Sequence, residues 1–78
     1  MEIKILGTGC AGCRALYDTV REAVAEMGID ASVVKEENMM HILTYNVLQM
    51  PALVIDEQVV ATGRKTLTEV KELLNKQL

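Results

Sequence analysis

The sequence predicts an α/β fold of element order βαβαββα, in which a four-stranded mixed sheet has helices on both faces. Short runs of β-branched residues alternate with stretches whose apolar residues recur at helical spacing. A helical crossover between the first two strands makes them parallel. A short turn between the last two makes them antiparallel. The length of 78 residues predicts one domain, residues 1–78.

The first strand is predicted over residues 2–6, where polar and β-branched residues alternate. Gly7 and Gly9 then favour a tight loop. The helix that follows begins near Cys10, spans about four turns, and ends at Gly28, a residue suited to a left-handed C-terminal cap. Its apolar positions recur at helical spacing: Cys13, Leu16, Val20, Ala23, Val24 and Met27.

The middle of the chain predicts a second strand over residues 31–35, a short helix and a third strand over residues 52–55. Asn38 is a suitable N-cap for the short helix, and Asn46 tolerates the positive φ that can end it. The apolar side of this helix has Met39 or Met40, Ile42, Leu43 and Tyr45. The third strand has no polar face, which is typical of a strand buried on both faces.

The C-terminal part predicts a hairpin followed by a helix. Asp56 and Glu57 form the expected turn, although the glycine that a type I′ hairpin prefers is missing. The fourth strand is expected over residues 58–61. Thr66 and Glu69 have the spacing of a capping box. The inner side of the last helix is predicted to consist of Leu67, Val70, Leu73, Leu74 and Leu78.

The composition excludes two classes of partner. Eight Lys and Arg against eleven Asp and Glu give a net charge of −3, so the positive surface that nucleic-acid binding requires is not expected. The longest apolar run, Met50 to Ile55, is far shorter than the ~18 residues of a membrane span. Glu2 and Lys4 interrupt any hydrophobic signal-peptide region. We therefore expect a cytoplasmic protein that binds neither nucleic acid nor membranes.

Cys10 and Cys13 are the two cysteines of the chain. A disulfide between them would close a very short loop and add little stability, so the pair indicates chemistry. In a cytoplasm that keeps thiols reduced, the alternatives are redox exchange and metal binding. The helix N-terminus favours a thiolate at Cys10, which makes Cys10 the expected nucleophile. Cys13, in register with Leu16, should be the more buried sulfur that resolves a mixed disulfide.

A structural zinc site is the simplest metal alternative. Zinc requires four ligands, and besides the cysteine pair the chain offers one histidine, His41. We expect His41 to be solvent-exposed in the first turn of the short helix. The sequence therefore predicts no metal site of this kind.

Three motifs together resemble the thioredoxin fold, in its small redox-active disulfide form close to the glutaredoxins in size. They are Cys10-Ala11-Gly12-Cys13 after the first strand, Met50-Pro51 before a buried strand, and Gly63 ahead of the last helix. The resemblance covers the whole chain. It implies a thiol-disulfide oxidoreductase in which Cys10 attacks, Cys13 resolves and Pro51 is a cis-proline beside them.

The resemblance also implies the binding properties of the site. The backbone of Met50 would pair with an extended substrate segment. The implied substrate contacts are Ala11, Gly12, Met50, Pro51 and Gly63. The redox-active disulfide is the only redox group, with no further cofactor. The implied partners are disulfide-containing protein substrates and a reductase that the sequence does not identify.

The chain departs from the family pattern at several positions. Ala11 and Gly12 stand where thioredoxins usually have Gly-Pro and glutaredoxins Pro-Tyr, so redox potential and substrate do not follow from the resemblance. The first strand has no counterpart of the buried aspartate that accepts a proton in thioredoxin. Thr62-Gly63 replaces the tandem glycine of glutaredoxins, so glutathione binding is not implied. Met50 is either a pliable contact surface or core filler.

A copper(I) carrier is the alternative from another class. Gly7-Thr8-Gly9-Cys10 and Cys13 resemble the Gly-Met-x-Cys-x-x-Cys loop of heavy-metal-associated domains, and two thiolates suit Cu(I). Those domains have the order βαββαβ, however, and Thr8 replaces their methionine. A third alternative is a non-enzymatic binding scaffold, which the intact cysteine pair disfavours. The predicted function is thiol-disulfide exchange.

Overall fold

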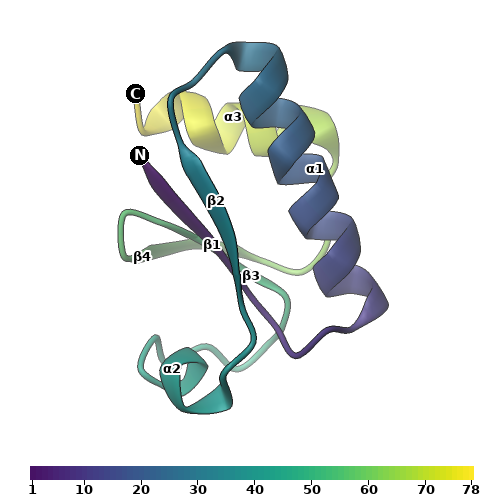
Figure 1. Ribbon diagram of the computed structural model, residues 1–78, viewed down its shortest axis with the longest axis vertical. Coiled ribbons are helices and arrows are strands. Elements are labelled where there is room, and N and C mark those ends of the chain that lie inside the picture. Colours follow the sequence, from purple (N-terminus) through teal and green to yellow (C-terminus); the bar gives the residue numbers. More distant parts are fainter.

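The computed structural model describes residues 1–78 and has the predicted element order (Figure 1). The elements are β1 (Glu2–Leu6), α1 (Ala11–Met27), β2 (Ser32–Glu36), α2 (Met39–Leu43), β3 (Ala52–Ile55), β4 (Gln58–Thr62) and α3 (Leu67–Lys76). The strands form one sheet in the order β2-β1-β3-β4. β1 is parallel to β2, and the other two pairings are antiparallel. The predicted mixed sheet is therefore confirmed.

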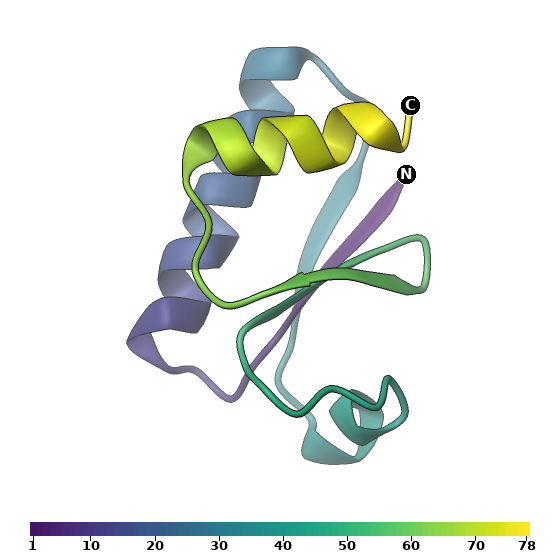
Figure 2. The same ribbon diagram turned by 180° about the vertical axis from the view of Figure 1, so that it is seen from behind.

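Helices α1 and α3 cover one face of the sheet. Successive strand residues point to opposite faces, so Ile5 packs toward α1 whereas Leu6 packs toward α2. Figure 2 shows α1 and α3 crossing each other, with α2 at the other end of the molecule. The core beneath α1 and α3 consists of Ile3, Ile5, Leu16, Val20, Ala23, Leu53, Ile55, Val70 and Leu74.

The short helix α2 covers part of the opposite face. Its Ile42 is buried against Leu6, Ala52 and Val54. All four residues of β3 are at most 1% exposed, which confirms a strand buried on both faces. The predicted arrangement of helices on both faces is confirmed as well. None of the three helices is both long and apolar enough to cross a membrane.

Three helix ends are capped as predicted. The backbone N–H of Met40 donates to the Asn38 side chain. Thr66 and Glu69 form a complete capping box, with both side-chain to backbone hydrogen bonds present. Gly28 caps α1 in the left-handed conformation, with φ of 65°. The prediction for Leu78 is wrong, because α3 ends at Lys76 and Leu78 is 72% exposed.

The β3–β4 turn forms without glycine. Asp56 and Glu57 have φ values of 47° and 71°, both in the left-handed region. Their side chains bond to β1: the backbone N–H of Glu2 donates to Asp56 Oδ1 at 2.8 Å, and Lys4 Nζ donates to Glu57 Oε1 at 2.8 Å. These long-range contacts offset the conformational cost of a turn whose local sequence is not ideal.

Candidate active site

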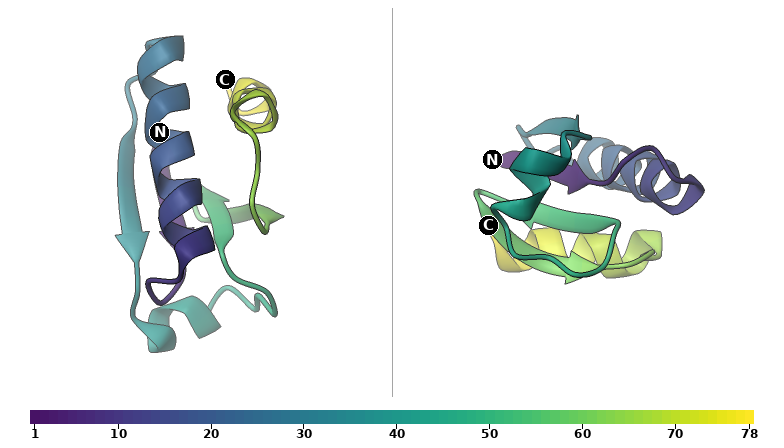
Figure 3. Two further views of the ribbon diagram at one scale, coloured as in Figure 1. Left: turned by 90° about the vertical axis from the view of Figure 1, so that its right-hand side faces the viewer. Right: turned by 90° about the horizontal axis from the view of Figure 1, so that it is seen from below.

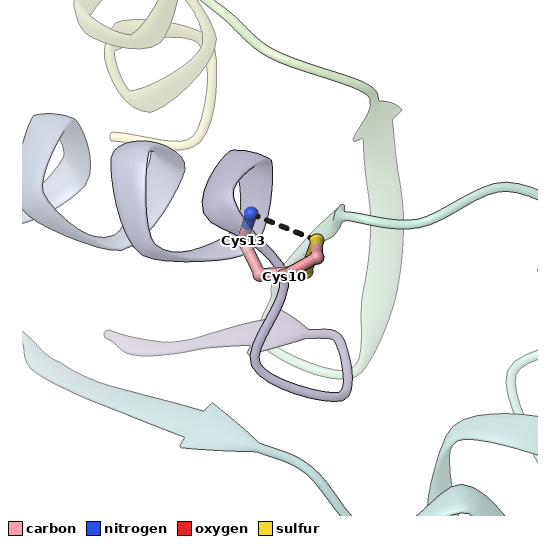
Figure 4. Close-up of a disulfide and its surroundings, with 2 residues drawn as sticks. All are labelled: Cys10 and Cys13. Atoms are coloured by element: carbon pink, nitrogen blue, oxygen red, sulfur yellow. Dashed lines mark hydrogen bonds between the residues drawn. A yellow bond between two sulfur atoms is a disulfide. The ribbon is translucent and has the colours of Figure 1, made fainter.

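The cysteine pair occupies the N-terminus of α1. Cys10 is the N-cap residue, with an extended backbone at φ −70° and ψ 164°. Its Sγ accepts a hydrogen bond from the backbone N–H of Cys13 at 3.2 Å (Figure 4). The two residues form a disulfide, with Cα atoms 5.1 Å apart. Cys10 is exposed and Cys13 is only 5% exposed, which is the difference predicted from the helical spacing.

Gly7 provides the space that the buried sulfur requires. A Cβ atom on Gly7 would lie 2.9 Å from Cys13 Cβ and would overlap Cys13 Sγ. The backbone N–H of Gly7 donates to the carbonyl of Glu36 at 3.0 Å, so this close approach is fixed by pairing with the end of β2. The sequence marked Gly7 only as a loop residue, whereas the structure shows that it packs directly beneath Cys13.

Gly12, Pro51 and Gly63 come together on one side of the disulfide. A Cβ atom on Gly12 would stand 3.5 Å from Pro51 Cδ. The N–H of Gly63 donates to the carbonyl of Pro51 at 2.7 Å. The Met50-Pro51 peptide bond is cis, as the resemblance implied, and Pro51 is buried. Three segments that are distant in sequence therefore meet next to the cysteine pair.

The two remaining predicted contact residues lie at the rim of this site. Ala11 is exposed at the first position of α1. Met50 is 40% exposed and belongs to neither buried cluster. The interpretation of Met50 as core filler is therefore wrong, and its side chain is available at the surface.

Sequence reasoning missed the charged residues around the disulfide. Beneath Cys13 a cavity of about 60 Å³ is lined by Ile5, Gly7, Gly9, Cys13, Arg14, Lys35 and Glu37. On the other side, Arg64 lies over Gly12, with its Nε 3.4 Å from the position that a Cβ would take. Arg14 and Arg64 directly follow Cys13 and Gly63 in sequence, and this adjacency was the signal that could have identified them.

The metal donors at this site are the two sulfurs. No group of three or more His, Cys, Asp and Glu side chains is arranged so that it could hold a metal ion. His41 is exposed, as predicted, and its ring is hydrogen-bonded to the carboxylate of Glu36. The element order also differs from the βαββαβ order of heavy-metal-associated domains.

A family model described as the thioredoxin domain matches residues 1–75. The chain belongs to the thioredoxin family. It is 41% identical over 76 residues to a thioredoxin of Methanothermobacter thermautotrophicus, covering 96% of this chain and 99% of that protein. It is 38% identical over 77 residues to a thioredoxin of Methanocaldococcus jannaschii, covering 97% of this chain and 88% of that protein.

Solved structures of thioredoxins have the same fold. Chloroplastic thioredoxin z matches with a TM-score of 0.73 at 19% identity, over 96% of this chain and 75% of that one. Thioredoxin 1 of Thermosipho africanus matches with a TM-score of 0.67 at 19% identity, over 99% of this chain and 93% of that one. The predicted thioredoxin-like fold is thus confirmed.

Family membership and the Cys10–Cys13 disulfide identify the protein as a thiol-disulfide oxidoreductase. This confirms the predicted activity and the resemblance on which part of it rested. Neither the family nor the element order supports the copper(I) carrier. As thioredoxin relatives imply in general, disulfides are the substrates and a reductase supplies the electrons.

Proposed function

We propose that Cys10 is the attacking thiol and Cys13 the resolving thiol of this oxidoreductase, with no cofactor beyond their own disulfide. The observation that supports these roles is the difference in exposure: Cys10 is exposed, whereas Cys13 is 5% exposed. A bulky protein disulfide can reach only an exposed sulfur. The buried sulfur can still reach Cys10, because the two already bond to each other.

The exchange proceeds in two balanced steps. The Cys10 thiolate attacks one sulfur of the substrate disulfide, and the other substrate sulfur leaves as a thiolate. The Cys13 thiolate then attacks Cys10 Sγ and expels the second substrate sulfur. The substrate gains two electrons, and the protein is left as the Cys10–Cys13 disulfide. A reductase returns it to the dithiol form.

The N-terminus of α1 supports a thiolate at Cys10. Unpaired backbone N–H groups and the positive end of the helix dipole stabilise negative charge there. The backbone N–H of Cys13 points at Cys10 Sγ. The first turn of α1 contains no acidic residue that would oppose the charge. Cys10 is therefore placed to ionise more readily than an ordinary cysteine.

The substrate segment would lie along the rim formed by Met50, Pro51 and Gly63, with Ala11 and Gly12 beside it. Met50 is exposed, and its backbone can pair with an extended chain by strand addition. On this proposal residues 1–78 act as one domain on disulfide-containing protein substrates, with a reductase still to be identified. The site of action is the cytoplasm, where thiols are kept reduced.

A trapping experiment tests these roles. Cys13→Ser should accumulate a mixed disulfide with substrate at Cys10, visible by mass spectrometry, because the resolving thiol is absent. Cys10→Ser should accumulate none and should lose insulin reduction in the presence of dithiothreitol. If Cys10→Ser is the variant that traps substrate, or if Cys13 alkylates faster than Cys10 near neutral pH, the assigned roles are wrong.

A further inference from the structure

The charged side chains near the disulfide are mostly basic, although the whole chain has a net charge of −3. Arg14 and Lys35 line the cavity beneath Cys13, where Glu37 partly offsets their charge. Arg64 lies on the opposite side, over Gly12. The surroundings of the disulfide are thus more positive than the average surface of this protein.

The side chain of Arg64 lies beside the cysteine pair. A Cβ atom on Gly12 would stand 3.4 Å from Arg64 Nε and 3.7 Å from Arg64 Cγ. The side chain therefore lies across the peptide between the two cysteines, in the space that Gly12 leaves. Pro51 Cδ borders the same space at 3.5 Å. Arg64 and Pro51 therefore border the same space at Gly12, next to the rim where we place the substrate segment.

The guanidinium of Arg64 has no partner within the protein. The four ion pairs involve Lys4 twice, His41 and Lys71. Arg21 and Lys35 lie over the ring of Tyr17. Arg64, by contrast, is exposed and takes part in none of these contacts. Its five N–H donors, in a planar fork that matches a carboxylate, remain available.

We infer that Arg64 selects partner segments with an Asp or Glu next to the reactive cysteine. This inference rests on the proposed exchange at Cys10, since the partner must pass along the Pro51 rim to bring its flanking residue to Arg64. A carboxylate there can accept two parallel hydrogen bonds from the guanidinium. A basic flanking residue is repelled by the positive charge of Arg64, which lowers the rate at which such a partner associates with the site.

Three disulfide-linked peptides that differ only in the residue flanking each cysteine test the inference. That residue is Asp, Asn or Lys, and kcat/KM is measured with dithiothreitol as reductant. We expect the Asp peptide to react about three to five times faster than the Asn peptide at low salt, the size typical of an exposed ion pair. Raising the salt to about 0.5 M should remove most of this preference.

Variants of Arg64 separate recognition from a general effect on Cys10. Because the ratio of rates between peptides is compared, any change in the reactivity of the Cys10 thiolate cancels. Arg64→Gln should bring the ratio of the Asp-peptide rate to the Asn-peptide rate close to one. Arg64→Glu should make the Lys peptide react faster than the Asp peptide. Arg64→Lys should retain part of the preference. Arg21→Gln removes the same charge from α1 at the ring of Tyr17 and should leave the ratio unchanged.

The outcomes distinguish the two proposals. Equal rates for the three peptides with the unaltered protein would overturn the role of Arg64 and leave the exchange chemistry intact. A preference that survives Arg64→Gln, or that Arg21→Gln removes equally, would also overturn it. If none of the peptides is reduced faster than by dithiothreitol alone, the proposed exchange at Cys10 fails, and the role of Arg64 fails with it.

Discussion

The two faces of the sheet are covered in different ways. Beneath α1 and α3, nine apolar residues are fully buried in one cluster. Beneath α2, four are buried, while Met40, Leu43 and Leu48 are 74%, 58% and 100% exposed on the same segment. Figure 3 shows the short α2 at one end of the sheet, away from α3. The cysteine pair lies on the well-covered face, because α1 begins at it.

Polar contacts supplement the small cluster under α2. Lys4 Nζ donates to Tyr45 Oη at 3.1 Å and to Glu57 at 2.8 Å. Tyr45 Oη also donates to Glu57 Oε2 at 2.9 Å. The chain from α2 to Met50 is thus tied to β1 and to the hairpin by a few surface bonds. A firmly packed face therefore positions the sulfurs, while Met50, in our proposal a substrate contact, follows the more weakly packed segment after α2.

Core truncations should show the largest difference between the faces. Leu16→Ala removes a side chain that is 1% exposed in the cluster under α1 and should cost about 3 kcal/mol of unfolding free energy. Ile42→Ala, also 1% exposed, should cost about 2 kcal/mol, because the short α2 can settle into the space. Urea denaturation measures both. If Ile42→Ala lowered the free energy of unfolding more than Leu16→Ala, the face under α2 would not be the more weakly packed one.

Two glycines beside the cysteines should respond oppositely to alanine. At Gly7 the added Cβ would overlap the Cys13 sulfur, so Gly7→Ala should cost about 1–3 kcal/mol. At Gly12 the nearest atoms would be at 3.4 and 3.5 Å, which is ordinary contact. Gly12→Ala should therefore gain up to about 0.5–1 kcal/mol from helix propensity.

Urea denaturation of the disulfide and dithiol forms tests this pair of variants. The cost at Gly7 should appear in both forms, since the overlap involves Cys13 in either state. A neutral Gly7→Ala would show that β1 can move away from the cysteine turn, and the well-covered face would then be less rigid than its packing indicates.

Local features of the fold could be predicted from the sequence because they depend on residues three or four apart. The N-cap at Asn38, the capping box at Thr66 and the unequal burial of Cys10 and Cys13 are of this kind. The predicted end of α3 was wrong, because no glycine or proline marks the end of this helix and the leucine spacing continues to Leu78.

Contacts between distant segments could not be predicted in this way. Lys4 meets Glu57 across 53 positions in sequence, and Arg64 meets Gly12 only because β4 ends next to the start of α1. Such contacts depend on strand order and register, which single-sequence patterns do not fix. The meeting of Pro51 with the cysteine pair came from the family resemblance, not from local spacing.

Acid should weaken the α2 face through Glu57. Hydrogen bonds from Lys4 and from Tyr45 hold the pKa of Glu57 below its ordinary value of 4.5. The folded state therefore binds fewer protons than the unfolded state in this range, so the stabilisation is present above pH 4.5 and is lost as pH falls through the lower folded pKa. Glu57→Gln should make stability less dependent on pH in this window.

Two other carboxylates, Glu26 and Glu69 on the helices of the opposite face, also contribute to the dependence of stability on pH. The hydrogen bond from Lys71 lowers the pKa of Glu26, and that from the Thr66 backbone lowers the pKa of Glu69. Glu57→Gln should therefore flatten the pH profile only in part, and Glu26→Gln should flatten it further in the same direction. Urea midpoints measured across this range decide the point. An unchanged profile in Glu57→Gln would show that the surface bonds of the α2 face contribute nothing measurable.

The smallest expected effect is at Leu48. Its side chain is fully exposed in the folded protein, so unfolding exposes no more of it, and Leu48→Ser should change the free energy of unfolding by less than about 0.5 kcal/mol. The neighbouring Val47 packs against the cluster under α2 and is half-buried. Val47→Ser should therefore cost about 1–2 kcal/mol by the loss of apolar burial.

Leu48→Ser and Val47→Ser together show how far the packed cluster under α2 extends along the chain. Both substitutions lie in the same segment between α2 and β3, so any general effect of placing serine there is common to them. A clear cost at Val47 with none at Leu48 would place the edge of the packed cluster between these two residues. A cost at Leu48 above about 1 kcal/mol would mean that this segment is packed in solution, and the contrast between the two faces would then not hold.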